Sequence, residues 1–259
     1  MDGRWIWLSF PLDVHGPRPP AIPAPSLKPL MTIAKDGAAV QTLRLASHTG
    51  THLDAPLHVV ENGLAVGDFQ PDEFVFTRPV VVDLASPERA VVMPAQLEPH
   101  RARLRGADIA LFRFGYGPLR RESPARYCDQ CPGFGVEAGR WLRERLPSLR
   151  ALGMDVPSAA CIADLDRTMA CHAELLEGTG RRFLIIEDMN LEHDLEGLRE
   201  VRIWPWLVRG MDSGPCAVVG FVPAAGHRRA PRPPGVTKPG RQAGDRGDRP
   251  ERKPGLRRH

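Results

Sequence analysis

The pattern of short apolar runs is the feature that most limits how this chain can fold. Seven runs are rich in branched or aromatic residues, and Gly, Pro or Asp bounds each of them. Runs of this length and composition are typical of β-strands. They lie at residues 5–10, 41–46, 80–85, 109–114, 182–186, 201–208 and 216–222.

Two segments have the apolar spacing of helices instead. Residues 136–146 carry apolar side chains three to four positions apart and should end near Pro147. Residues 163–177 carry leucines and a methionine that we expect on one helical face. Because strands outnumber helices, we predict an α/β fold with a strand-rich mixed sheet, partly closed or barrel-like, and flanking helices.

Composition divides the chain near residue 224. Residues 225–259 contain 11 Lys and Arg against 3 Asp and Glu, a charge of +8, whereas residues 1–224 carry −4. The segment is rich in Pro and Gly and cannot bury enough surface to offset its ordering entropy. We predict a folded domain at 1–224 and a disordered basic tail at 225–259. Nucleic-acid binding by the tail is not favoured, because no aromatic residues interleave its charges.

Cysteine usage and hydropathy favour a cytoplasmic protein. The five cysteines are an odd number, and the N-terminus does not resemble a signal peptide, so we expect no disulfide framework. Cys128 and Cys131 form a lone CxxC, which we interpret as two incidental thiols because no second pair exists. The apolar runs are far shorter than the ~20 residues that span a bilayer, so no membrane span is expected.

The segment HTGTHLDAPLH, residues 48–58, concentrates side chains that bind metals. His48, His52 and Asp54 offer the imidazole and carboxylate groups that borderline divalent ions prefer. A further histidine, His58, closes the segment.

Neither regular structure brings these ligands together. On a helix Asp54 would lie roughly opposite His52, and on a flat strand His48 and His52 would be roughly 13 Å apart, whereas ligands bind an ion at ~2.0–2.2 Å. The chain must therefore bend between them, and Gly50 at the midpoint is the residue best able to turn. We expect a strand that ends near Ala46, followed by a bent loop.

These residues also resemble the signature of the metal-dependent cyclase family, which includes bacterial kynurenine formamidase and isatin hydrolase. The similarity continues in GMDVPS, HAELLEGTGRRFLIIEDMNLEHDL and SGPCAVVGFV and covers most of residues 5–222. It implies a cyclase-like swivelling β/β/α fold and a homodimer. It further implies that His48, His52 and Asp54 bind metal, with the aspartate able to bridge two ions, and that His58 acts in catalysis.

Two distant ligands, His172 and Glu187, are implied by the same resemblance. His172 is expected to share an inward helical face with Leu165 and Leu176. Glu187 closes the apolar run FLII, where a carboxylate is costly unless a cation or several donors meet it. Other glutamates fit exposed helix or loop positions better: Glu174, Glu177 and Glu192.

A site of this kind predicts a metal-dependent hydrolase of a carbon–nitrogen amide bond. One or two bound ions would activate water and polarise a carbonyl oxygen. Zinc is the first expectation and manganese the second, since the ligand set contains no thiolate. His58 would pass a proton to the departing nitrogen, and Pro56 would stiffen the loop that carries it.

The substrate is open among small amides. The resemblance implies formylated aromatic or cyclic amides, and hence arylformamidase activity in tryptophan catabolism, with ring opening or cyclisation as alternatives. Kynurenine formamidases are expected to carry a tryptophan in the proline-rich stretch after the first strand, and PRPPAIPAPSLKP has none. A catalytically inactive binding protein with a nucleic-acid-binding tail is the alternative from another class. Aromatic side chains for a substrate pocket or a dimer seam are Trp5, Trp7, Trp204, Trp206 and Phe114.

Overall fold

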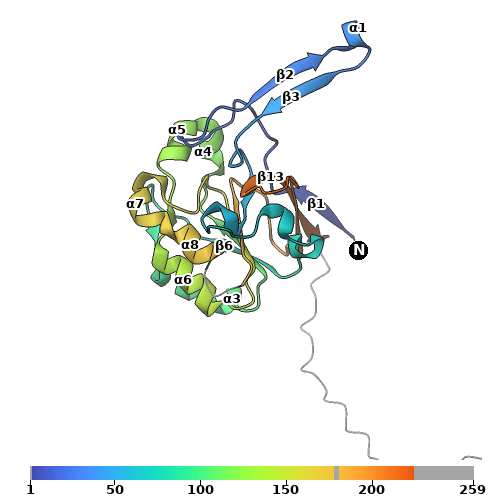
Figure 1. Cartoon of the computed structure of the whole chain (residues 1–259). Helices are drawn as coiled ribbons and strands as arrows, with labels where there is room; N and C mark the ends of the chain where they lie inside the picture. The colour runs from blue at the N-terminus through green and yellow to red at the C-terminus, as the bar shows by residue number, and fades with distance from the viewer. Residues whose placement is uncertain (1, 178–180, 225–259) are drawn as a thin grey trace, which may run out of the picture. The chain divides into compact units, whose positions relative to one another are not determined.

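A computed structural model describes residues 2–177 and 181–224 of the chain (Figure 1). The predicted tail at 225–259 lies outside the described residues.

The centre of the fold is a nine-stranded mixed sheet that is partly closed, as predicted. β1 (Gly3–Trp7) pairs with β13, off the main path of strands. Along that path the order is β5 (Val75–Phe76), β12 (Glu200–Pro205), β13 (Ser213–Pro223), β4 (His52–Asp54), β11 (Leu184–Glu187), β10 (Ala151–Met154), β8 (Ile109–Arg113) and β6 (Pro79–Asp83).

The short strand β4 joins two halves of this sheet. β4 pairs antiparallel with β11 on one side and with the start of β13 on the other. Beyond β11, the strands β10, β8 and β6 are all parallel. Beyond β4, the long strand β13 pairs antiparallel with β12 and β1. Parallel neighbours need crossover connections, which here carry most of the helices.

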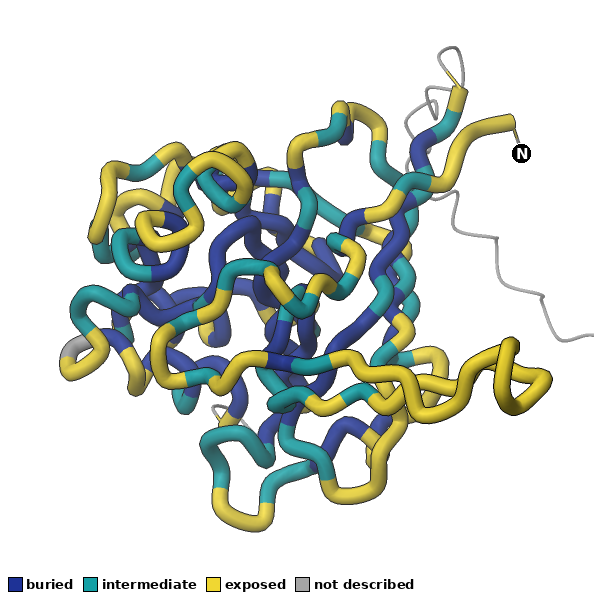
Figure 2. The backbone as a smooth tube through the Cα atoms, turned by 90° about the horizontal axis from the view of Figure 1, so that it is seen from above, coloured by how far each residue is buried: buried dark blue, intermediate teal, exposed yellow. Residues whose placement is uncertain are grey.

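The parallel half of the sheet is buried on both faces. In β8, Ile109 and Leu111 belong to one core cluster, whereas Ala110 and Phe112 belong to the other. Successive side chains of a strand point to opposite faces, so two cores sandwich this strand. Double burial explains why the sequence shows continuous apolar runs here rather than alternation. The buried segments gather at the centre of the tube in Figure 2.

Helices cover one face of the parallel strands. α6 (Val136–Arg145) packs against α8 (Ala170–Leu176), and α6 ends before Pro147 as predicted. A Cβ at Gly139 would lie 3.1 Å from Cys171 Sγ, so glycine permits the close approach of these helices. The other helices are short: α2 (Pro94–Leu97), α3 (Arg101–Leu104), α4 (Gly117–Glu122), α5 (Pro124–Asp129), η1 (Pro56–His58), η2 (Val66–Asp68), η3 (Pro71–Phe74) and η4 (Glu98–His100).

The predicted helix over 163–177 is broken into three pieces. They are η5 (Ile162–Asp164), α7 (Leu165–Thr168) and α8. The Thr168 hydroxyl donates to the carbonyls of Cys161 and Asp164, an alternative bonding pattern that short hydroxyl side chains offer the backbone. Leu165 is exposed, so its expected place on the inward face with His172 was wrong, whereas Leu176 and His172 are buried.

A hairpin projects from the body of the molecule (Figure 1). It consists of β2 (Ser26–Met31), α1 (Ile33–Asp36) and β3 (Val40–Arg44), and almost all of its residues are exposed. β3 is the strand predicted at 41–46, but β2 was not predicted. A second small sheet pairs β7 (Val91–Val92) with β9 (Gly133–Phe134). No helix within the described ranges is long and apolar enough to cross a membrane.

Candidate metal centre

Strand pairing brings three predicted ligands to one face of the sheet. His52 and Asp54 lie two residues apart in β4, so both side chains point to the same face. Glu187, the last residue of β11, is the direct cross-strand partner of His52. Directly opposite residues share a face, which places the Glu187 carboxylate beside the His52 ring. The segment 52–54, expected in a loop, is therefore a strand, and that strand aligns the ligands.

The predicted bend brings in His48. Gly50 has a φ of +65°, in the left-handed region that favours glycine. Its carbonyl lies 2.8 Å from His52 Nδ1, and this contact orients the His52 ring with Nε2 toward the carboxylates. The bend places His48 Nδ1 3.0 Å from Asp54 Oδ1. β3 ends at Arg44, two residues before the predicted boundary.

His172 completes the cluster from the helical layer. It lies in α8 and is buried. Its Nε2 is 3.2 Å from Glu187 Oε1 and 4.0 Å from Asp54 Oδ2. On the other side, His52 Nε2 is 3.1 Å from Glu187 Oε2. The three predicted imidazole ligands therefore meet around the two predicted carboxylate ligands, which are both buried.

The two carboxylates stay ionised because the imidazoles surround them. Burial alone would raise the pKa of Asp54, but His48 and His52 outweigh it and hold that pKa well below its usual range. Burial and the Asp54 charge would raise the pKa of Glu187, yet His172 and His52 lower it to about 2. Burial lowers the pKa of His52, but Glu187 and Asp54 together raise it to about 9. The site thus attracts positive charge, and a divalent cation could replace the imidazole protons.

Hydrogen bonding leaves several of these atoms without a suitable partner. Among the described residues, both Asp54 carboxylate oxygens and His52 Nε2 are buried and make no hydrogen bond of normal geometry. Buried polar atoms without partners are costly, and metal coordination would satisfy them. Two carboxylates and three imidazoles are also ligands that zinc and manganese accept. The residues therefore fit a metal centre.

His58 stands at the edge of this cluster. It ends η1, which Pro56 begins, and its ring is half-buried. Its centroid lies 4.3 Å from that of His48 and 5.4 Å from that of His172. Burial lowers the pKa of His58 below its ordinary value, because the rings of His48 and His172 offset the attraction of Asp54. A neutral imidazole beside the ligands can accept or deliver a proton.

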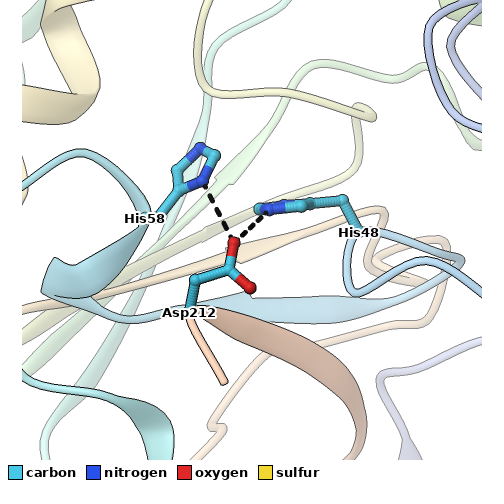
Figure 3. A group of neighbouring side chains, drawn as sticks. All are labelled: His48, His58 and Asp212. Atoms are coloured by element: carbon cyan, nitrogen blue, oxygen red, sulfur yellow. Dashed lines mark hydrogen bonds and ion pairs between the residues drawn. The ribbon is translucent and has the colours of Figure 1, made fainter. Parts of the chain in front are cut away.

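Asp212 is a site residue that the sequence did not reveal (Figure 3). It directly precedes β13, and one of its oxygens, Oδ2, lies 3.0 Å from His48 Nε2 and 3.6 Å from His58 Nδ1. His48, His58 and Asp212 could also hold a cation between them. The only signal in the sequence is an aspartate directly before the strand that begins SGP.

The other candidate residues belong to none of the candidate metal groups that the described residues form. Cys128 and Cys131 are buried, and none of the candidate metal groups among the described residues includes a cysteine. The interpretation of the CxxC as two incidental thiols is consistent with this placement. Of the aromatic candidates, Phe114 is buried in the same core cluster as Ala110 and Phe112. The four tryptophans considered for a pocket are largely exposed: Trp5, Trp7, Trp204 and Trp206.

Comparison with known proteins agrees with this fold. The chain is similar to the kynurenine formamidase of Bacillus anthracis, with 27% identity over 218 residues, which is 83% of this chain and 96% of the relative. Its fold matches isatin hydrolase A from Labrenzia aggregata bound to benzyl benzoate, with a TM-score of 0.71, 21% identity and coverage of 85% and 94%. A predicted metal-dependent hydrolase from Bacillus stearothermophilus matches with a TM-score of 0.66, 20% identity and coverage of 85% and 99%.

A family model matches more than half of the chain. It is the Cyclase model, described as "Putative cyclase", and it matches residues 6–160. The match includes the segment 48–58, whereas His172 and Glu187 lie beyond it, so the structure alone places those two residues beside the motif. The chain belongs to the Cyclase family.

Proposed function

We propose that this protein is a metal-dependent hydrolase that cleaves the carbon–nitrogen bond of a small amide. The observation that carries the proposal is the convergence of His48, His52, Asp54, His172 and Glu187, in which both buried oxygens of Asp54 lack a hydrogen bond. The set of ligand-type side chains is intact, which disfavours a binding protein that has lost turnover.

The bound ions in this proposal are zinc, one or two per chain, with manganese as the alternative. His48 and His52 approach Asp54 Oδ1, whereas His172 approaches Oδ2. Asp54 and these imidazoles would therefore hold the one or two ions together. The ligands include no thiolate, which leaves room for manganese.

His58 is the proton carrier of the proposed reaction. Ions bound at this site would lower the pKa of water and polarise the amide carbonyl. The half-buried His58 ring lies beside the proposed ligands and is not itself required to complete the set. It can take a proton from the attacking water and deliver it to the departing nitrogen.

The proposed substrate is a formylated or cyclic aromatic amide. Support comes from the relatives, one called a kynurenine formamidase and another an isatin hydrolase. Turnover of N-formylkynurenine would place the protein in tryptophan catabolism, whereas turnover of isatin would favour ring opening.

A panel of N-formylkynurenine, isatin and simple lactams, assayed with zinc- or manganese-loaded protein, tests this proposal. We expect turnover of at least one compound, and a loss of about 10²–10⁴-fold in kcat for His58→Ala with metal content unchanged. His100→Ala, which changes a histidine outside the cluster, should leave turnover intact. Full activity of His58→Ala, or no turnover of any amide by loaded protein, would contradict the assignment.

A homodimer and a cytoplasmic location belong to the same proposal. All five cysteines are free thiols, the form that a reducing compartment maintains. The projecting hairpin exposes apolar side chains that a second copy could cover: Leu27, Leu30, Met31, Ile33 and Val40.

Light scattering of the full-length protein tests the dimer. We expect a mass twice the chain's 28.6 kDa and a monomer for the double variant Leu30→Asp, Ile33→Asp. Leu165→Asp changes an exposed leucine elsewhere and should leave the dimer intact. A monomeric wild-type protein would refute the dimer without affecting the proposed chemistry.

A further inference from the structure

One carboxylate oxygen of Asp212 faces two of the site's histidines. Oδ2 lies 3.0 Å from His48 Nε2 and 3.6 Å from His58 Nδ1 (Figure 3). Ionised aspartate can only accept hydrogen bonds, so it favours a proton on each imidazole nitrogen that faces it. The side chain is 36% exposed, which places it at the open edge of the cluster rather than among the buried ligands.

The contact with His48 decides which of its nitrogens can bind an ion. His48 Nδ1 faces Asp54 Oδ1 at 3.0 Å, whereas Nε2 faces Asp212. A neutral imidazole carries one proton, and Nε2–H donated to Asp212 leaves the Nδ1 lone pair pointing at the metal centre. Histidines that bind metals commonly donate their second N–H to a carboxylate or a carbonyl, and this contact fixes ring and tautomer. In His52 the two nitrogens have exchanged roles: Nδ1 faces the Gly50 carbonyl, and Nε2 faces the carboxylates of the metal centre.

The contact with the proton carrier is longer: Asp212 Oδ2 lies 3.6 Å from His58 Nδ1, within ion-pair distance but beyond a hydrogen bond, and the charge of the carboxylate favours a proton on that nitrogen. A proton held on Nδ1, next to Asp212, leaves Nε2 as the nitrogen that can accept a proton. An aspartate that orients a catalytic imidazole in this way stabilises the positive ring that forms when the second proton arrives.

The backbone holds Asp212 in register with the motif. The Asp212 carbonyl accepts a hydrogen bond from Ala55 N at 3.0 Å, and the next residue, Ser213, pairs with Asp54 across β13 and β4. These contacts tie the main chain of Asp212 to the segment that carries His48, His52 and His58. The distance to both rings is therefore set by sheet pairing, although 164 residues separate Asp212 from His48.

We propose that Asp212 is a positioning residue that fixes the tautomers of His48 and His58, the first for metal binding and the second for proton transfer. This inference rests on the proposed metal-dependent function. Asp212 acts through the two imidazoles, and it contributes no ligand of its own to the ion.

Competition with a zinc chelator measures the effect on metal binding. We expect Asp212→Ala to bind zinc about 10–100-fold more weakly at the ion held by His48. Asp212→Asn keeps an oxygen that can accept the His48 N–H and should recover part of the affinity. Asp83→Ala removes an exposed carboxylate that pairs with Arg113, outside the cluster, and should bind zinc like the wild type.

Nitrogen-15 NMR of histidine-labelled, zinc-loaded protein reports the tautomers directly. We expect Nε2–H for His48 and Nδ1–H for His58 in the wild type, and a changed proton position for at least His58 in Asp212→Ala. In turnover assays the same variant should lose kcat more than it raises KM, since ring orientation affects the reaction rather than substrate binding.

The outcomes separate this inference from the proposed function. Unchanged zinc affinity and unchanged tautomers in Asp212→Ala would overturn the positioning role while leaving the hydrolase intact. Loss of one equivalent of zinc from Asp212→Asn at saturating metal would also overturn it, since Asp212 would then be a ligand. A wild-type protein that binds no zinc or manganese would instead refute the proposed function itself.

Discussion

Asp188 stabilises the turn of the backbone directly after Glu187, a proposed ligand. It directly follows Glu187 and has a φ of +53°, which is uncommon for a residue other than glycine. Arg120 binds both of its carboxylate oxygens, at 2.7 and 2.8 Å, and the Tyr127 hydroxyl donates to one of them. Its carbonyl accepts a hydrogen bond from the Thr51 hydroxyl. These contacts tie the end of β11 to α4, α5 and the residue before β4.

Removal of this carboxylate should destabilise the protein strongly. In Asp188→Ala, Arg120, whose side chain is only 10% exposed, would lose its counter-charge, and we expect the free energy of unfolding to fall by about 3–5 kcal/mol. Urea denaturation of the full-length protein measures the change. Glu192→Ala removes the partner of the neighbouring Arg121, which is 57% exposed, and should have little effect because water screens that pair. Equal losses of unfolding free energy in the two variants would show that the Asp188–Arg120 pair stabilises the protein no more than the exposed Glu192–Arg121 pair does.

The residues of the site differ in how far the sequence could predict them. His48, His52, Asp54 and His58 could be found because they lie within eleven consecutive residues. His172 and Glu187 were identified through a family resemblance, and the apolar residues around them then indicated buried positions. Asp212 could not be found, because its contact depends on the pairing of β13 with β4 across 164 residues.

At the scale of elements, the turn at Gly50 determines whether His48 and His52 converge. In Gly50→Ala the left-handed backbone would cost about 1–2 kcal/mol, and the new Cβ would lie 3.3 Å from Leu12 Cδ1. We expect the metal-free variant to relax out of this turn, so that zinc binding must restore the turn and becomes roughly 5–30-fold weaker, the equivalent of that cost.

Gly37→Ala is the matched control for this prediction. Gly37 has a φ of +75° at the end of α1 in the projecting hairpin, and a Cβ there would meet nothing within 4 Å. The variant carries similar backbone strain away from the site, so its zinc affinity should equal that of the wild type in the same chelator competition. An equal loss of affinity in both variants would mean that the bend does not position the ligands.

Long apolar strands could be predicted, but short ones could not. All seven predicted strands are present with shifted ends, because branched and aromatic runs identify buried strands well. The central strand β10 was missed, since its sequence ALGM is short and contains Gly153 in place of a branched residue. A Cβ at Gly153 would lie 2.3 Å from Met189 Sδ, so tertiary packing rather than strand propensity selects glycine there.

At the scale of the whole molecule, the site and the charge of the chain belong to different segments. Every residue of the proposed site lies between 48 and 212, whereas residues 225–259 carry a charge of +8. We expect a chain that ends at residue 224 to keep its metal content and turnover. Its net charge would change from +4 to −4, so retention on a heparin column should fall. Loss of turnover on truncation would show that the tail contributes to the site.

Measuring metal content and amide turnover on the same purified protein tests the proposed hydrolase most directly. Elemental analysis of full-length purified protein should find one or two zinc or manganese ions per chain. Chelation should abolish hydrolysis of the amide identified in the substrate panel, and added Zn²⁺ or Mn²⁺ should restore it, because the buried carboxylates and imidazoles need the ion to activate water. A metal-free protein that hydrolyses the amide at the full rate would contradict the metal-dependent mechanism.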